Sequence, residues 1–108
     1  MKNTNNLHAI PNTEDRFIVK LERNNRNLTR FNAKLASYTC EPKTASLYEK
    51  RMFLKLKMEQ LRNKNHETVN AIRKHIITNP LEIAKTQVEE FNSVYLQYKE
   101  YMATVKNS

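Results

Sequence analysis

The chain has 108 residues, a formal net charge of +8 at pH 7 and no glycine. Without glycine, the tight turns of hairpins and barrels have only asparagine to supply positive φ, which argues against an all-β fold. Hydrophobic residues make up 39% of the chain and recur periodically, which argues against a wholly disordered protein. At this length we expect a single domain, and an all-α one.

Cysteine content and hydropathy bear on the compartment of the protein. A lone cysteine, Cys40, cannot form an intramolecular disulfide and indicates a reducing compartment. The first residues lack the continuous apolar run of a secretory signal, and no stretch approaches the roughly 18 apolar residues of a membrane span. We therefore expect an intracellular protein, cytoplasmic or nuclear, that does not enter a membrane.

The N-terminal third predicts an arm followed by a helix. Residues 1–12 lack periodicity and cluster Asn and Thr, so we expect a flexible, disordered arm there. A helix is predicted at about 13–40, with acidic residues in its first turn and an apolar stripe at steps of three and four. Asn24 interrupts this stripe. It either fixes register and oligomeric state as a polar seam residue or marks a kinked turn. The stripe comprises Phe17, Leu21, Leu28, Phe31, Leu35 and Tyr38.

A second helix is predicted at about 44–78. It can begin at Thr44 or Ser46, because Ser46 and Glu49 have the spacing of a capping box. Met52, Phe53 and Leu56 widen its apolar face beyond one stripe, so we expect this helix to contact two neighbours. Its seam comprises Leu47, Leu54, Met58, Leu61, Val69, Ile72 and Ile76, with Arg51 and Asn65 at intervening positions.

A third helix is predicted at about 80–105. Asn79 can cap it and Pro80 suits its first position, since the missing N–H would be unpaired there anyway. The short turn before Pro80 predicts that the second and third helices form an antiparallel hairpin. The predicted seam comprises Leu81, Ala84, Val88, Phe91, Tyr95, Tyr98, Met102 and Val105.

Together these elements predict an elongated, antiparallel, coiled-coil-like three-helix bundle over residues 13–108. Its length and heptads are similar to those of spectrin-type repeats, although this chain contains no tryptophan.

Most of the positive charge belongs to the second helix. Residues 1–42 carry +3, residues 43–78 carry +6 and residues 79–108 carry −1. Lysines recur every seven residues along one flank of this helix and could contact phosphates. The alternatives are a solvated flank whose aliphatic stems cover the core, or a bias of A/T-rich coding DNA. The candidate phosphate contacts are Lys43, Lys50, Lys57, Arg62 and Lys64.

Catalytic and metal-binding patterns are missing from the sequence. His66 and His75 are nine residues apart, which places them on opposite sides of a helix. Glu89 and Glu90 are adjacent and therefore diverge, so they do not make a general acid and base pair. We expect no enzyme activity, no metal or other cofactor, and no small-molecule substrate.

The third helix carries the most suggestive surface for a partner. Phe91, Tyr95 and Tyr98 are expected chiefly in the bundle core, whereas Val94 and Tyr101 lie off the predicted seam and are expected to contact a partner. The leading hypothesis is a non-enzymatic, oligomeric protein-interaction module that acts as an adaptor or scaffold. The alternative is nucleic-acid binding through the basic flank of the second helix. The candidate interface residues are Asn24, Val94, Tyr98, Tyr101 and Met102.

Overall fold

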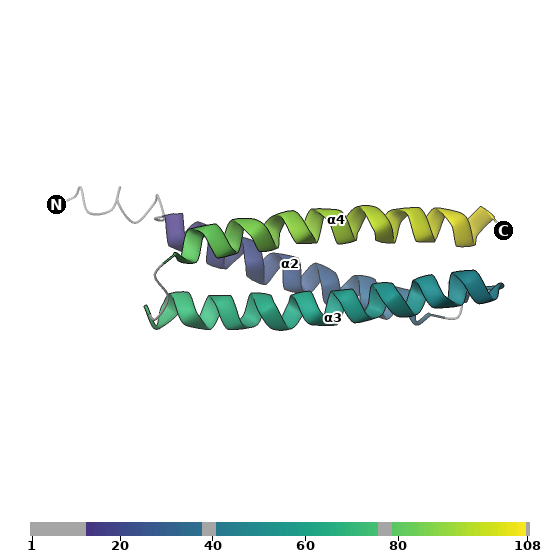
Figure 1. Ribbon diagram of the computed structural model, residues 1–108, viewed down its shortest axis with the longest axis horizontal. Coiled ribbons are helices and arrows are strands. Elements are labelled where there is room, and N and C mark those ends of the chain that lie inside the picture. Colours follow the sequence, from purple (N-terminus) through teal and green to yellow (C-terminus); the bar gives the residue numbers. More distant parts are fainter. Residues whose placement is uncertain (1–12, 38–40, 76–78, 108) are drawn as a thin grey trace.

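The computed structural model describes residues 13–37, 41–75 and 79–107, which form a bundle of three helices without strands (Figure 1). Helix α2 spans Thr13–Leu35, α3 spans Ala45–Arg73 and α4 spans Pro80–Asn107. Every pair of helices is in contact, and successive helices run in opposite directions. The predicted all-α, antiparallel three-helix bundle is confirmed. The predicted arm, residues 1–12, lies outside the described residues.

Helix α2 ends at Leu35, five residues earlier than predicted. The chain turns immediately afterwards, where the Ser37 N–H donates to the Lys34 carbonyl at 3.1 Å. The terminal carbonyl of Leu35 accepts a hydrogen bond from the Arg51 guanidinium of α3 at 3.4 Å. A side chain from the neighbouring helix therefore satisfies one of the carbonyls that a helix end leaves without an intrahelical partner.

Helix α3 begins after Thr44, which is its N-cap. Thr44 has extended backbone angles, and its hydroxyl accepts a hydrogen bond from the Leu47 N–H at 3.1 Å. Ser46, the other predicted start, lies inside the helix. The side chain of Thr44 thus satisfies one of the free donors of the first turn.

Replacing this cap should weaken the bundle measurably. We expect Thr44→Ala to lower the free energy of unfolding by about 1 kcal/mol, because the Leu47 N–H loses its acceptor. Urea denaturation followed by circular dichroism measures the change. Ser46→Ala is the matched control, and an equal loss in both variants would show that Thr44 does not act as the cap.

Helix α3 ends at Arg73, five residues before the predicted end. Lys74 is the C-cap, and His75 follows with a φ of 55°. The positive-φ position that often ends a helix is usually occupied by glycine or asparagine, but His is also enriched there. We expected asparagine to supply positive φ in this glycine-free chain, and here His75 supplies it instead. Residues 76–78, including Ile76 of the predicted seam, lie outside the described residues.

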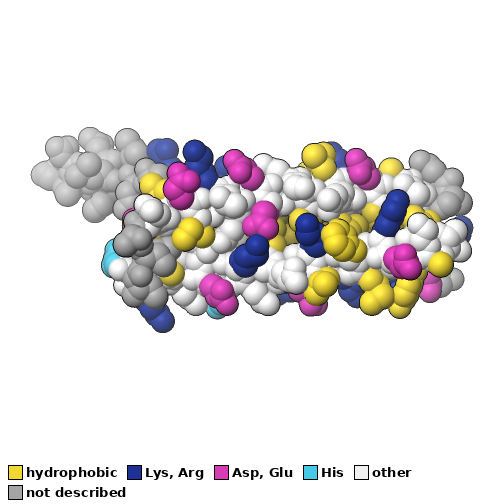
Figure 2. Space-filling model, viewed as in Figure 1, with side chains coloured by type: hydrophobic (Ala, Val, Ile, Leu, Met, Phe, Trp, Pro, Cys, Tyr) yellow, Lys and Arg dark blue, Asp and Glu magenta, His cyan; other side chains and the backbone are white. Residues whose placement is uncertain are grey.

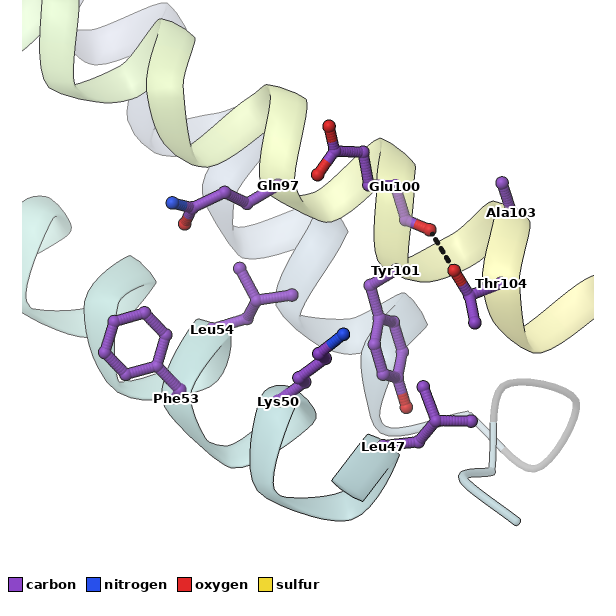
Figure 3. A pocket seen from close by; sticks show the side chains of 9 residues that line it. All are labelled: Leu47, Lys50, Phe53, Leu54, Gln97, Glu100, Tyr101, Ala103 and Thr104. Atoms are coloured by element: carbon purple, nitrogen blue, oxygen red, sulfur yellow. Dashed lines mark hydrogen bonds between the residues drawn. The ribbon is translucent and has the colours of Figure 1, made fainter. Parts of the chain in front are cut away.

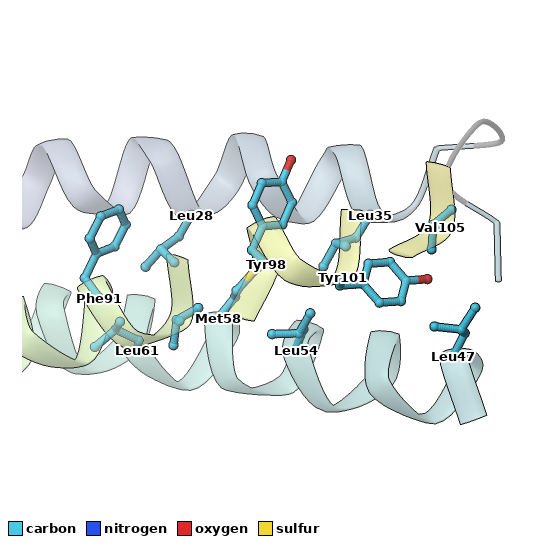
Figure 4. Packing of buried hydrophobic residues seen from close by; sticks show 11 residues of the cluster. Leu28, Leu35, Leu47, Leu54, Met58, Leu61, Phe91, Tyr98, Tyr101 and Val105 are labelled. Atoms are coloured by element: carbon cyan, nitrogen blue, oxygen red, sulfur yellow. The ribbon is translucent and has the colours of Figure 1, made fainter. Parts of the chain in front are cut away.

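The apolar core is divided into two clusters along the bundle. The larger lies towards the start of α3 and the end of α4 and is shown in Figure 4, where its side chains from all three helices interdigitate. It comprises Leu28, Leu35, Leu47, Leu54, Met58, Leu61, Phe91, Val94, Tyr98, Tyr101 and Val105. The smaller comprises Ile18, Leu21, Val69, Ile72 and Ala84.

Along each helix, the residues of a buried polar layer fall between those of the two apolar clusters. The Asn65 amide donates to Asn25 Oδ1 at 2.8 Å, and its own oxygen accepts from Gln87 Nε2 at 2.7 Å. The Thr68 hydroxyl donates to Gln87 Oε1 at 2.7 Å. Asn65, Thr68 and Gln87 are buried, with Asn65 at 0% exposure. These hydrogen bonds join all three helices, and they set which residues of α4 face inward.

Candidate interaction surface

Four large apolar side chains are exposed on the first half of α3. They are Tyr48, Met52, Phe53 and Leu56, and their exposed fractions lie between 48% and 54%. Tyr48, Met52 and Leu56 are spaced by four residues and therefore form one stripe on the helix, with Phe53 beside it. We call these four residues the α3 patch. Figure 2 shows hydrophobic side chains gathered over the end of the bundle that holds the start of α3 and the end of α4.

The α3 patch adjoins a groove between α3 and α4 (Figure 3). This groove has a volume of about 610 Å³. Leu54 and Tyr101 form its floor, since each is 3% exposed, while the more exposed Phe53 and Lys50 line its rim. The exposed apolar surface of α3 therefore continues, through Phe53, into the groove. The lining comprises Leu47, Lys50, Phe53, Leu54, Gln97, Glu100, Tyr101, Ala103 and Thr104.

The lysines spaced by seven residues follow the α4 side of α3. Lys50 lines the groove, and Lys57 and Lys64 line a smaller hollow of about 60 Å³ beside Val94. The Lys57 ammonium lies 5.3 Å from the centre of the Phe53 ring, within the range of a cation–π contact. Lys64 pairs with Glu90 of α4 at 3.0 Å. Two of these lysines, Lys57 and Lys64, therefore already make contacts within the chain.

The other predicted phosphate contacts are arranged differently. Lys43 is exposed just before the start of α3. Arg62 is half-buried, and its carbonyl accepts a hydrogen bond from the Asn25 side chain at 3.2 Å, which ties its backbone to α2. The structure therefore places Lys50, Lys57 and Lys64 along the boundary of α3 and α4, and it does not place Arg62 with them.

Positive charge is concentrated at the end of the bundle that carries the groove. Residues 26–37, 41–64 and 88–107, which we call the groove half, hold twelve basic and six acidic side chains, a net charge of +6. The remaining described residues hold six basic and five acidic side chains, a net charge of +1. An anionic partner would therefore be attracted to the groove half. Figure 2 shows Lys and Arg side chains among the hydrophobic ones on this face.

The predicted partner contacts on α4 lie in the core instead. Val94 is 4% exposed and Tyr101 3%, because both pack in the larger apolar cluster. Tyr95, which was expected in the core, is 38% exposed and stacks on Phe31 of α2 with ring centres 5.4 Å apart. Val94 and Tyr101 were expected on the surface of the bundle, and this placement was wrong for both residues.

The remaining predicted interface residues are also inside the bundle or at its edge. Tyr98 is buried, as its expected core position required, and Met102 is half-buried against the same cluster. Asn24 is buried within a continuous α2, so the helix is not broken at this residue. None of these three residues presents a broad surface to a partner.

The exposed α3 patch was missed because three of its four members were assigned to packing. Met52, Phe53 and Leu56 were expected to let α3 contact two neighbours, but α2 and α4 both pack on the narrower stripe through Leu54 and Met58. The spacing of Tyr48, Met52 and Leu56 by four residues, on the side away from that stripe, was the available signal.

No group of three His, Cys, Asp or Glu side chains that could hold a metal ion is found within residues 13–37, 41–75 and 79–107. Over the same ranges, no helix has the length and apolar character needed to span a membrane. Comparisons with protein-family models, with curated proteins and with solved structures found no match to this chain. The fold and this surface define it as an α-helical bundle with an exposed apolar and basic face.

Proposed function

We propose that this protein is a non-enzymatic interaction module that binds a protein partner through the α3 patch and the adjoining groove. The exposure of Tyr48, Met52, Phe53 and Leu56 carries the proposal. Large apolar residues scattered singly over a surface are ordinary, whereas a contiguous patch beside a groove is typical of an interaction site.

The energy available from covering the patch supports this function. Burying a fully exposed Phe, Leu or Met side chain contributes about 1.5–3 kcal/mol, and the members of the patch are about half exposed. Covering them would therefore offset part of the entropic cost of association. The aromatic members, Tyr48 and Phe53, are of the type enriched among residues that dominate binding energies or at interface cores.

The proposal is tested by capturing partners on the intact protein and on a patch variant. Met52→Ser, Phe53→Ser and Leu56→Ser combined should reduce retention of a bound partner by at least about tenfold, because the anchor side chains are removed. Circular dichroism should show unchanged helix content, since all three side chains are exposed.

The matched control replaces two exposed apolar residues outside the groove half, Val19→Ser and Ile83→Ser, and should keep the partner. Light scattering on the intact protein reports whether it also assembles with itself. A strictly monomeric protein whose captured proteins are the same with and without the patch would contradict the proposal.

Nucleic-acid binding is the second candidate function, and the net charge of +6 on the groove half favours it. Such binding would leave the α3 patch uncovered and would depend on lysines alone. It would also have to compete with the pairing of Lys64 to Glu90. A partner contact through the patch uses both the apolar and the basic residues of this face, and we therefore rank it first.

A further inference from the structure

We infer that the occupant of the α3–α4 groove is an amphipathic helix of a partner protein, with acidic residues spaced by seven along one flank. This inference rests on the proposed function and specifies the chemistry of the partner. It depends on three features: the shape of the groove, the composition of its rim and the spacing of its lysines.

The shape fits a rod. The groove lies between two antiparallel helices, and a helix laid there would contact α3 and α4 together, as helices do in four-helix bundles. Its apolar stripe would cover Phe53 on the rim and reach towards Leu54 and Tyr101 on the floor (Figure 3). The apolar lining from α3, Leu47 to Leu54, extends over two turns of the helix, farther than a small ligand would need.

The rim is basic. Residues 43–57 hold five basic side chains and one acidic side chain, Glu49. The basic side chains flank the α3 patch: the Arg51 guanidinium lies 5.7 Å from the centre of the Tyr48 ring, and the Lys57 ammonium lies over Phe53. A carboxylate beside the patch would therefore find a cation already in place, without a change in the helix.

The lysine spacing specifies the partner more closely. Lys50, Lys57 and Lys64 recur every seven residues along one flank of α3: Lys50 lines the groove, and Lys57 and Lys64 line the smaller hollow between the same two helices. A helix that runs along the groove repeats its own flank at the same interval, because two packed helices share the heptad period. Glu or Asp at positions i, i+7 and i+14 of the partner would then face the three lysines in turn.

Other occupants match this surface less well. A symmetric contact with a second copy through this face would set the lysines of one groove half against those of the other. A nucleic acid or an acidic lipid surface would satisfy the lysines. A nucleic-acid duplex offers no apolar stripe for Phe53, however, and a lipid surface is flat where the groove is concave.

The test uses fluorescence anisotropy with the intact protein and three synthetic 21-residue helices that share one leucine seam. Their i, i+7, i+14 flank carries Glu, Gln or Lys. We expect the Glu helix to bind at least about tenfold more tightly than the Gln helix, and the Lys helix to bind most weakly. Phe53→Ala should weaken binding of the Glu helix by about tenfold, while Val19→Ala should leave it unchanged.

Charge reversal keeps the test independent of folding. Lys50→Glu combined with Lys57→Glu should transfer the preference from the Glu helix to the Lys helix, an outcome that a misfolded variant cannot produce. Lys74→Glu with Lys85→Glu, exposed outside the groove half, is the matched control and should keep the preference for Glu.

Equal binding of the three helices, or binding of none, would overturn the inference. So would tighter Phe53-dependent binding of vesicles of acidic phospholipid or of a duplex oligonucleotide. If the helices fail while the triple serine variant still loses captured partners, the inference falls and the proposed function stands. If both measurements are insensitive to the patch, both fall.

Discussion

Tyr101→Ala should lower the free energy of unfolding by about 3–5 kcal/mol, the usual cost of truncating a buried aromatic side chain. Tyr101 is 3% exposed and packs in the larger apolar cluster, to which α2 and α3 also contribute side chains (Figure 4). Since small domains are stable by about 5–15 kcal/mol, this loss is a large part of the total. Urea denaturation followed by circular dichroism measures it.

Two comparison variants separate the effect of burying the ring from the effect of the tyrosine hydroxyl. Tyr101→Phe keeps the ring and should lose far less stability than the alanine variant. Tyr48→Ala removes the same side chain from an exposed site and should cost less than about 1 kcal/mol, as surface substitutions usually do. Equal losses at positions 101 and 48 would show that Tyr101 does not lie in the core.

Asn65→Ala should lower the free energy of unfolding by about 2–4 kcal/mol, because each buried polar group left unpaired costs roughly 1–3 kcal/mol. The change removes the donor to Asn25 Oδ1 and the acceptor for Gln87 Nε2. The hydrogen bond from Thr68 holds the Gln87 side chain in place, so Gln87 cannot simply turn to water. The same denaturation experiment measures the loss.

Replacing the three buried members of the layer together should have the opposite result. Asn65→Leu, Thr68→Val and Gln87→Leu together leave little polar surface to satisfy, and the combined variant should be at least as stable as the intact protein. Buried polar residues can also fix the register and number of helices, so this variant should show a mixed mass by light scattering. A combined variant as unstable as Asn65→Ala would contradict the role of these residues as one network.

The polar layer explains why the α4 prediction was half right. Two interleaved seams share Ala84, Phe91, Tyr98 and Val105: one adds Val88, Tyr95 and Met102, and the other adds Gln87, Val94 and Tyr101. By hydropathy the first is favoured, since Gln counts as a surface residue. The bundle buries the second, because Gln87 finds partners on α3 when it faces inward.

The candidate site was predicted only in part. The lysines spaced by seven were predicted to share one flank of α3, and Lys50, Lys57 and Lys64 do line hollows between α3 and α4. The apolar part of the site was not found. The spacing of Met52 and Leu56 set them apart from the core stripe, but whether they would meet a neighbouring helix depends on how closely α2 and α4 approach.

By itself, the sequence determined the helical fold, because its periodicity, its capping residues and its lack of glycine act over only a few residues. Thr44 and Pro80 mark two helix starts through such local effects. Only the tertiary structure decided which face of α4 turns inward, where α2 and α3 stop and which apolar residues of α3 stay exposed. Those outcomes depend on partners distant in sequence, such as Gln87 for Asn65 and Leu35 for Arg51.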